Sequence, residues 1–449
     1  MDSIVDPEAR NLGYAKEALR GIPSVSLSFH RYLPIAALYF FFNAAGLPTG
    51  LFYTTIFAPF LYVWLYLRGH RWVTAKFLFI LSPFIIAHLI LGIASIVYYL
   101  RSLLLLWSVY IAVVTFCWAL TKTGTVQRLF DQLILLNFAA CVLAILVLPT
   151  PMRLVLWHDD AATIVGASHL LRLNLLSTEP SAYALLMLPL LIYGSLRLFN
   201  RVNLNNCVRF SMIGFPFLLC QSFGGISMAI AALGVSLVTA NRRVIKRAPT
   251  LITLMCFVIA IILIVGTHNP ISERVFQVAS GGDSSSRSRT IFSFVAAYAV
   301  ASSKSLVWGA GLGQGKLVDF SALGIGFGVN VIPNAVAGTF AELGFIGVLV
   351  KLVAEGYLFY RTKPYRSTFR LAMFTVAFIT QLTGSYLTDV QEYILWFLAF
   401  YPVFGNSVFP EEAVPGAEQL DGADIPEKAG HQERSKVELP RTLEPRRES

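Results

Sequence analysis

Residues 172–196 read RLNLLSTEPSAYALLMLPLLIYGSL, and this stretch carries the main signal for the fold. A short polar segment ends in Glu179 and Pro180 and is followed at once by the apolar run 181–196. Proline is favoured at the first position of a helix, and a carboxylate there interacts well with the helix dipole. The stretch therefore predicts an apolar helix that begins at Pro180.

The whole chain shares this apolar character. Of its 449 residues, 56% are hydrophobic and only 13% are charged, whereas a soluble domain has about 25% charged residues. The apolar runs are continuous rather than alternating, which excludes a transmembrane β-barrel. The sequence therefore predicts an all-α, polytopic membrane protein. Its net charge of +10 follows from the loop charges that orient such proteins and does not indicate a nucleic-acid partner.

Twelve apolar runs are candidate transmembrane helices, and twelve helices of about 21 residues would occupy roughly 250 residues. The runs lie at about 32–47, 51–67, 77–98, 102–120, 133–149, 181–196, 210–221, 223–240, 251–267, 335–357, 371–387 and 392–409. They define a transmembrane domain at 32–409, which follows a cytoplasmic segment at 1–31. The tail 410–449 is rich in Glu, Pro, Arg and Gly and is expected to be disordered in the cytoplasm.

Basic residues occur in every second loop. The loops that carry them lie near residues 70, 125, 203, 245 and 365. Cytoplasmic loops of membrane proteins have an excess of Lys and Arg, so these loops and both termini are expected to be cytoplasmic. The two long loops at about 150–180 and 268–334 then lie outside, and the second of them comes before the tenth helix.

Glu179 and Arg172 are the first candidates for chemistry, because charge is scarce in this chain and costly to keep at a membrane. One interpretation is structural, with Glu179 and Ser177 capping the helix that follows. The other is functional, with Glu179 facing an outer-leaflet cavity as a general base and Arg172 binding an anion. Both interpretations can hold at once.

The second long loop contains Arg287 and Arg289, within the Gly/Ser-rich stretch 280–289. A guanidinium presents a planar fork of donors that fits phosphate oxygens, so both arginines are candidates for binding a pyrophosphate; the alternative is contact with lipid headgroups. The apolar segment 290–303 is too short to span a bilayer. It is expected to lie along the membrane surface or to pack over the helices. Gly309–Gly315 is expected to form a tight turn at the bilayer edge.

Asn334 and Glu342 lie at the outer start of the tenth apolar run and are further polar candidates. Lys351 and Glu355 are four residues apart on the same predicted helix, which predicts an internal ion pair. His88, in the third predicted helix, is expected to be a packing residue with satisfied hydrogen bonds.

Three short motifs occur in order along the chain. They are the Arg…Ser-Thr-Glu-Pro-Ser segment 172–181, an arginine such as Arg289 about 20 residues before Gly-x-Gly-x-Gly at 309–313, and Asn334 followed by Ala-Glu-Leu-Gly-Phe-Ile-Gly at 341–347. Their order and placement, with twelve apolar runs and a large outer loop before the tenth, resemble the Wzy-like polysaccharide polymerases, which are relatives of the O-antigen ligases.

The resemblance covers most of residues 30–405 and implies an enzyme of the bacterial inner membrane. Such a polymerase transfers a growing glycan from an undecaprenyl-pyrophosphate carrier to the next lipid-linked repeat at the outer face. The candidate site is Glu179 and Arg172 for catalysis, with Arg287, Arg289, Asn334 and Glu342 for substrate binding. No nucleotide, metal or other cofactor is expected, since the sequence has no cluster of metal ligands. The expected partners are the lipid bilayer and a chain-length regulator and a flippase of the same pathway.

Two other functions stay open. The ligase branch typically carries a histidine where this chain has Pro333, which disfavours an O-antigen-type ligase that transfers glycan to a lipid or protein acceptor. A transporter or flippase for lipid-linked oligosaccharide would place polar, interrupted helices at the bilayer midplane, often in repeated halves. Here the polar residues gather at the outer end instead, which favours an enzyme.

Overall fold

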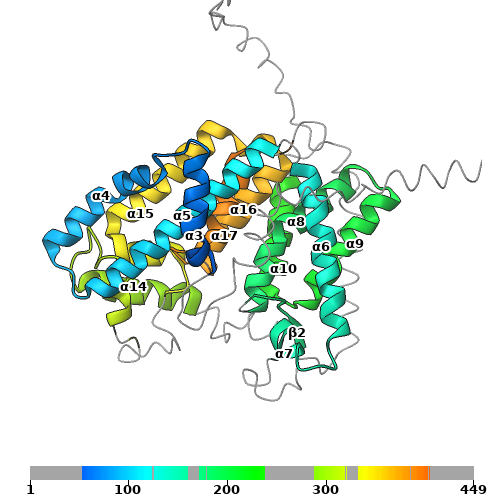
Figure 1. The fold of residues 1–449 in the computed structure, drawn as a ribbon, viewed down its shortest axis with the longest axis horizontal. Coiled ribbons are helices and arrows are strands. Elements are labelled where there is room, and N and C mark those ends of the chain that lie inside the picture. Colours follow the sequence, from blue (N-terminus) through cyan, green and yellow to red (C-terminus); the bar gives the residue numbers. More distant parts are fainter. Residues whose placement is uncertain are drawn as a thin grey trace, which may run out of the picture. The chain divides into compact units, whose positions relative to one another are not determined.

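The structure of the chain is a computed structural model (Figure 1). The residues that it describes are 53–123, 126–159, 171–177, 179–237, 288–318, 320, 332–384, 386–402 and 404. The chain divides into two compact units, 1–411 and 412–449, and all of the described residues belong to the first. The parts of the sequence-based prediction that lie outside the described residues include the N-terminal segment 1–31, the apolar runs 32–47 and 251–267, the basic loop near 245, much of the two long loops, and the tail 410–449.

The described part of the chain is mostly helical (Figure 1). Its longer helices are α3 (Tyr53–Leu67), α4 (Val73–Leu91), α5 (Ile96–Thr123), α6 (Val126–Leu146), α8 (Pro180–Asn200), α9 (Leu204–Leu219), α10 (Phe223–Leu237), α14 (Ser293–Ser302), α15 (Ala335–Thr362), α16 (Thr368–Thr383) and α17 (Val390–Phe400). The shorter elements are α7 (Arg153–Leu156), β1 (Trp157–Asp159), β2 (Leu171–Leu173), η3 (Ser288–Phe292), η4 (Gln314–Leu317) and η6 (Pro364–Arg366). Ten of the predicted apolar runs fall wholly or partly on described residues, and each overlaps one of the longer helices.

Several helices are suited to a membrane. Within the described ranges, α4, α5, α6, α8 and α15 are long and apolar enough to cross a bilayer. The prediction of a helical, membrane-embedded protein is therefore confirmed in this general form. The remaining apolar helices are shorter, at 10–17 residues.

Helix α8 lies at the centre of the largest core. Inside one 18-residue window of α8, 89% of the residues are buried, against 28% for α4. It packs against α6, α9, α10 and α16, and its Tyr193 lies among the rings of Phe130 and Phe404. Because lipid is as apolar as leucine, such packing rests on van der Waals contact and buried hydrogen bonds. One of these is donated by the Tyr183 hydroxyl to Asn137 Oδ1 of α6 at 2.8 Å.

An ion-pair cluster links the start of α6, the end of α8 and the start of α9. Arg197 NH1 lies 3.2 Å from Asp131 Oδ1, and Arg209 NH1 lies 2.7 Å from Asp131 Oδ2. The Tyr193 hydroxyl also donates a hydrogen bond to this carboxylate. All of these residues sit beside loops that the charge pattern places in the cytoplasm.

Arg370, near the start of α16, binds the backbone carbonyls at the ends of two other helices. It donates to Thr362 O at the end of α15 and to Ala399 O and Phe400 O at the end of α17. A cation at helix C-termini is favourable because the last carbonyls have no partner within the helix. Arg370 therefore stabilises the ends of α15 and α17.

A small hairpin in the first long loop was not predicted from the sequence. Strands β1 and β2 pair antiparallel, with His158 opposite Arg172. Trp157 donates its indole N–H to Ala144 O near the end of α6 at 2.9 Å. The hairpin thus places Arg172 a few residues before the start of α8.

Helix α14 packs against α15 and buries Ala296, Ala297 and Val300. The segment 290–303 thus forms a short helix that packs over another helix, which confirms one of the two expectations for it. Small residues on the contact face allow the two backbones to approach closely.

Helix α15 is interrupted at Gly344, which has φ 69° and ψ −168°. In an unbroken helix, Phe345 N–H would donate to Ala341 O, and Ile346 N–H to Glu342 O. Here segment 305–311 instead supplies acceptors for the two N–H groups and donors for the two carbonyls. The new hydrogen bonds are Phe345 N to Leu306 O, Ile346 N to Val307 O, Ala310 N to Ala341 O and Gly311 N to Glu342 O, at 2.9–3.2 Å.

This insertion joins two motifs that the sequence shows separately. The glycine-rich stretch does form tight turns, with positive φ at Gly309, Gly311 and Gly313. A Cβ on Gly309 would lie 2.5 Å from Glu342 O, so only glycine allows the two backbones to meet. The turn therefore packs into the break of α15.

Candidate functional site

Glu179 occupies the N-cap position of α8, and Pro180 follows at the first helical position, as predicted. Its carboxylate, however, makes no capping hydrogen bond, and the Ser177 hydroxyl is buried without a hydrogen-bond partner. The expectation that these two side chains cap the helix is therefore wrong. Glutamate is one methylene longer than Asp and Asn, which cap well, and its side chain exceeds that of Ser by more. The Glu179 side chain instead is 50% exposed and points toward Arg289.

Arg289 of η3 is the residue that approaches Glu179. Its NH2 lies 4.0 Å from Glu179 Oε2, and its side chain is 33% exposed. On another side, a Cβ added to Gly384 would lie 3.3 Å from Arg289 NH1, so the glycine leaves room for the guanidinium. The start of α8, η3 and the end of α16 thus meet at one exposed pair of opposite charges.

Asn334 holds Arg289 in place. Its Nδ2 donates to Arg289 O at 3.1 Å and to Leu382 O at 2.6 Å, and its Oδ1 accepts from Ala337 N at 2.9 Å. The side chain is fully buried, and each of these bonds is internal to the protein. In this structure Asn334 is therefore a positioning residue for Arg289, and its role in substrate binding stays a prediction.

Tyr386 is a neighbour of this pair that sequence reasoning missed. It lies between α16 and α17, where burial, and then the negative charge of Glu179, raise the pKa of its hydroxyl, while Arg289 acts in the opposite direction. The phenol therefore stays protonated and can donate a hydrogen bond. Tyr386 falls at the end of the predicted apolar run 371–387, and nothing in the sequence links it to Glu179.

Arg172 does not share this position. It is buried on β2, and its Nε donates to Cys220 O at the end of α9, at 3.2 Å. This contact satisfies a carbonyl at a helix C-terminus. This contact gives no support to anion binding by Arg172. Arg287, which was predicted to bind pyrophosphate together with Arg289, lies outside the described residues.

Glu342 belongs to the break of α15 instead. Its carboxylate accepts a hydrogen bond from Gly313 N, with the positive charge of Lys316 nearby. His88 supports the same segment, because its Nε2 contacts Trp308 O at 2.9 Å and its Nδ1 contacts Tyr99 Oη at 3.1 Å. The prediction that His88 is a packing residue with satisfied hydrogen bonds is confirmed. The contact of Glu342 with Gly313 N holds the glycine-rich turn against α15.

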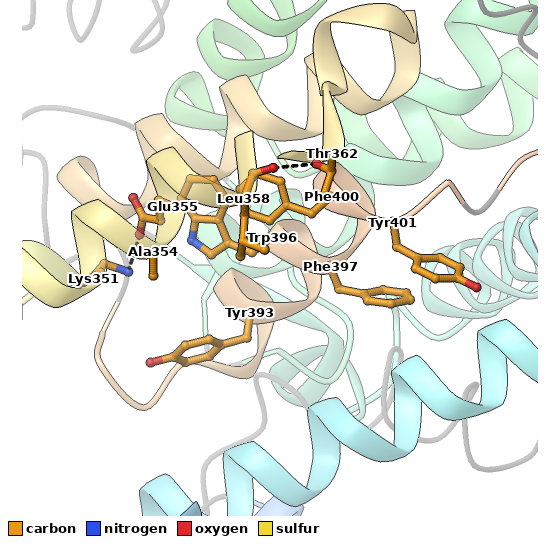
Figure 2. Close-up of a pocket in the computed structure, with 10 residues that line it drawn as sticks. All are labelled: Lys351, Ala354, Glu355, Leu358, Thr362, Tyr393, Trp396, Phe397, Phe400 and Tyr401. Atoms are coloured by element: carbon orange, nitrogen blue, oxygen red, sulfur yellow. Dashed lines mark hydrogen bonds and ion pairs between the residues drawn. The ribbon is translucent and has the colours of Figure 1, made fainter. Parts of the chain in front are cut away.

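Lys351 and Glu355 form the predicted ion pair, at 3.0 Å (Figure 2). The sequence did not reveal that Glu392 of α17 lies closer to the same ammonium, at 2.6 Å. Beside this cluster runs an open groove of about 500 Å³ between α15 and α17. It is lined by Lys351, Ala354, Glu355, Leu358, Thr362, Tyr393, Trp396, Phe397, Phe400 and Tyr401.

No protein-family model matches the chain, and no curated protein matches it in sequence. The chemistry of the site therefore rests on its geometry. An exposed carboxylate beside a guanidinium can accept a proton from a hydroxyl while the cation binds a neighbouring anion. Glu179, Arg289 and Tyr386 form the candidate site, and Asn334 holds it together.

Proposed function

We propose that this chain is a polysaccharide polymerase of the bacterial inner membrane. In this proposal it joins oligosaccharide repeats carried on undecaprenyl pyrophosphate, at the outer face of the membrane. The observation that carries the proposal is the pairing of Glu179 with Arg289, since they come from two of the three motifs of the family resemblance. The third motif contributes Asn334, which binds the Arg289 backbone.

The proposed reaction uses each of these groups. Glu179 takes the proton from the acceptor sugar hydroxyl, whose oxygen forms a bond to the anomeric carbon of the donor. The bond from that carbon to the pyrophosphate oxygen breaks, and Arg289 neutralises the charge that develops there. The pyrophosphate leaves on its lipid, and a chain-length regulator and a flippase of the pathway are the proposed partners.

The proposed topology has twelve spans and cytoplasmic termini. Its support is that helix ends in contact with each other always belong to the same predicted side of the membrane. The ends beside Glu179, Arg289, Asn334 and Tyr386 are all on the side that the charge pattern places outside. The ends beside the Asp131 cluster and Arg370 are all on the basic, cytoplasmic side.

Cysteine labelling checks this topology. We expect an impermeant thiol reagent applied to intact cells to modify Asp160→Cys and Ser302→Cys, because both lie in the proposed outer loops. Lys246→Cys should react only after the cells are opened. The natural cysteines are first replaced by serine. Labelling of Lys246→Cys in intact cells would contradict the topology.

Variants of Arg289 test the function itself. Lysine keeps the charge but loses the planar fork, so Arg289→Lys should lose about 1.5–3 kcal/mol of transition-state binding. Each 1.36 kcal/mol is about tenfold in rate, so polymer yield should fall by an order of magnitude or more. Gel profiles of surface glycan, read beside the amount of protein in the membrane, measure this.

Arg201→Ala is the matched control, since Arg201 is an exposed arginine at the other end of α8, about 31 Å away for a helix of this length. It should leave the glycan profile unchanged. Full polymer from Arg289→Ala would dismiss the proposed role of Arg289. If vesicles containing the protein move a lipid-linked oligosaccharide across the bilayer without elongating it, the transporter interpretation replaces the polymerase.

A further inference from the structure

The ion-pair cluster of Asp131, Arg197 and Arg209 has a surplus of positive charge. The two stretches that meet there, 121–131 and 197–209, contain five basic residues and one acidic residue, Asp131. Both oxygens of this carboxylate are in use, since Oδ1 lies 3.2 Å from Arg197 NH1 and Oδ2 lies 2.7 Å from Arg209 NH1. One negative charge therefore faces two guanidinium groups, and one of the two positive charges has no counterpart within the cluster.

Both guanidinium groups bind Asp131 through a single nitrogen. Arg197 and Arg209 each use NH1, and Arg197 NH1 also donates to the Tyr193 hydroxyl at 2.7 Å. Among the residues that the structure describes, none accepts a hydrogen bond from the Nε or NH2 of either arginine. The two side chains are 20% and 18% exposed, and none of these nitrogens is fully buried. Each arginine therefore keeps one edge of its guanidinium for a further ligand.

The position of the cluster along the helices suits a lipid headgroup. Arg197 is three residues before the end of α8 at Asn200, and Arg209 is five residues after the start of α9 at Leu204. At 1.5 Å per residue, both lie about 4–8 Å inside the helix ends, a depth from which a long cationic side chain reaches the headgroup region. The charge pattern places these ends on the cytoplasmic side, where anionic lipids give the membrane surface its negative potential.

An exposed apolar stripe on α9 begins beside Arg209. It consists of Leu204, Val208, Phe215 and Leu218, which are 43–81% exposed. Their spacing of four, seven and three residues places them on one face of the helix. The unused edge of Arg209 and an apolar surface thus lie next to each other. A ligand with both a phosphate and an acyl chain fits this combination better than a phosphate alone.

We propose that Arg197 and Arg209 bind the phosphate of an anionic phospholipid in the leaflet on the basic side of the membrane. Each arginine then bridges two anions, with NH1 on Asp131 and the planar fork of Nε and NH2 on phosphate oxygens. An acyl chain lies along the exposed stripe of α9. The lipid ties together the ends of α6, α8 and α9, which pack against one another (Figure 1). This inference is independent of the proposed polymerase activity.

Lipid titration of the purified full-length protein tests the ligand. We expect phosphatidylglycerol, added to delipidated protein in a neutral detergent, to appear as a bound lipid in native mass spectra. It should also raise the melting temperature by several degrees, because a ligand that binds only the folded state stabilises it. Zwitterionic phosphatidylcholine and inorganic phosphate at the same concentration should give no such rise. An equal rise with phosphatidylcholine, or with inorganic phosphate, would rule out an anionic lipid as the ligand.

Lysine variants separate a specific site from the general attraction of basic loops to anionic lipid. Arg209→Lys keeps the positive charge and can keep the ion pair with Asp131, but one ammonium cannot also present a fork to a phosphate. Its affinity for phosphatidylglycerol should therefore be about tenfold lower or less still. Arg201→Lys is the matched control, since Arg201 is an exposed arginine of the same connection, and it should bind like the wild type. Wild-type affinity in Arg209→Lys, or equal losses in both variants, would overturn the proposal.

Arg209→Gln adds a measurement of stability. It leaves Asp131 balanced by Arg197 alone, so without lipid the variant should melt close to the wild-type temperature. The rise in melting temperature with phosphatidylglycerol should be lost. A rise as large as that of the wild type would show that the lipid does not bind at Arg209 and would contradict the proposal.

Discussion

Replacing Glu179 by glutamine is expected to abolish polymer while the protein stays in the membrane at its normal level. Glutamine has the same shape but cannot take a proton from the acceptor hydroxyl, and a general base contributes about 10²- to 10⁴-fold to a rate. The stability cost should be small. Glu179 makes no capping hydrogen bond, and its pairing with Arg289 is exposed, a kind of contact worth about 0–1 kcal/mol.

Two measurements check this expectation. Gel profiles of surface glycan should lose all chains longer than one repeat, and the single-repeat lipid-linked intermediate should accumulate. Glu179→Asp keeps a carboxylate on a shorter side chain and should restore part of the polymer, which a purely structural role would not explain. A well-expressed Glu179→Gln variant with wild-type chain lengths would exclude Glu179 as the base.

Replacing Gly344 by alanine should prevent the protein from folding. The backbone there has φ 69°, where a non-glycine residue carries strain of about 1–3 kcal/mol. A Cβ would also overlap Val307 O and Gly309 N, and these are backbone atoms that cannot move away like a flexible side chain. The clash would push segment 305–311 out of the break and leave four backbone groups without partners.

The same helix offers matched controls for this change. Gly338 and Gly356 also lie in α15, but a Cβ at either one meets open space. Gly338→Ala and Gly356→Ala should be neutral or slightly stabilising, since alanine is the better helix former. The yield of monodisperse protein after detergent extraction compares the three variants. Equal yields would show that the interruption of α15 is not required for folding.

The positions of the helices could be read from the sequence because each depends on a local property. A continuous apolar run predicts a membrane helix wherever it occurs, and Glu179-Pro180 marks the start of α8 correctly. These local features do not show which side chains meet in the folded protein. Arg172 is seven residues from Glu179 in the chain, yet the cation within 4.0 Å is Arg289, far along the sequence.

What the sequence could not predict depends on contacts between distant segments. Glu392 lies on a helix of its own, so its pairing with Lys351 has no spacing that would reveal it, unlike the i, i+4 spacing of Lys351 and Glu355. Gly344 reads as a tolerated small residue inside an apolar helix. Its positive φ becomes necessary only once another segment supplies the missing hydrogen bonds.

The interruption of α15 has a consequence for how the chain is assembled. If a nascent α15 entered the bilayer by itself already interrupted at Gly344, the groups of Ala341, Glu342, Phe345 and Ile346 would be unbonded, at several kcal/mol each. Until segment 305–311 reaches them, an unbroken helix is the cheaper state. We therefore expect this helix to be inserted whole and to open at Gly344 only after the preceding outer loop has crossed the membrane.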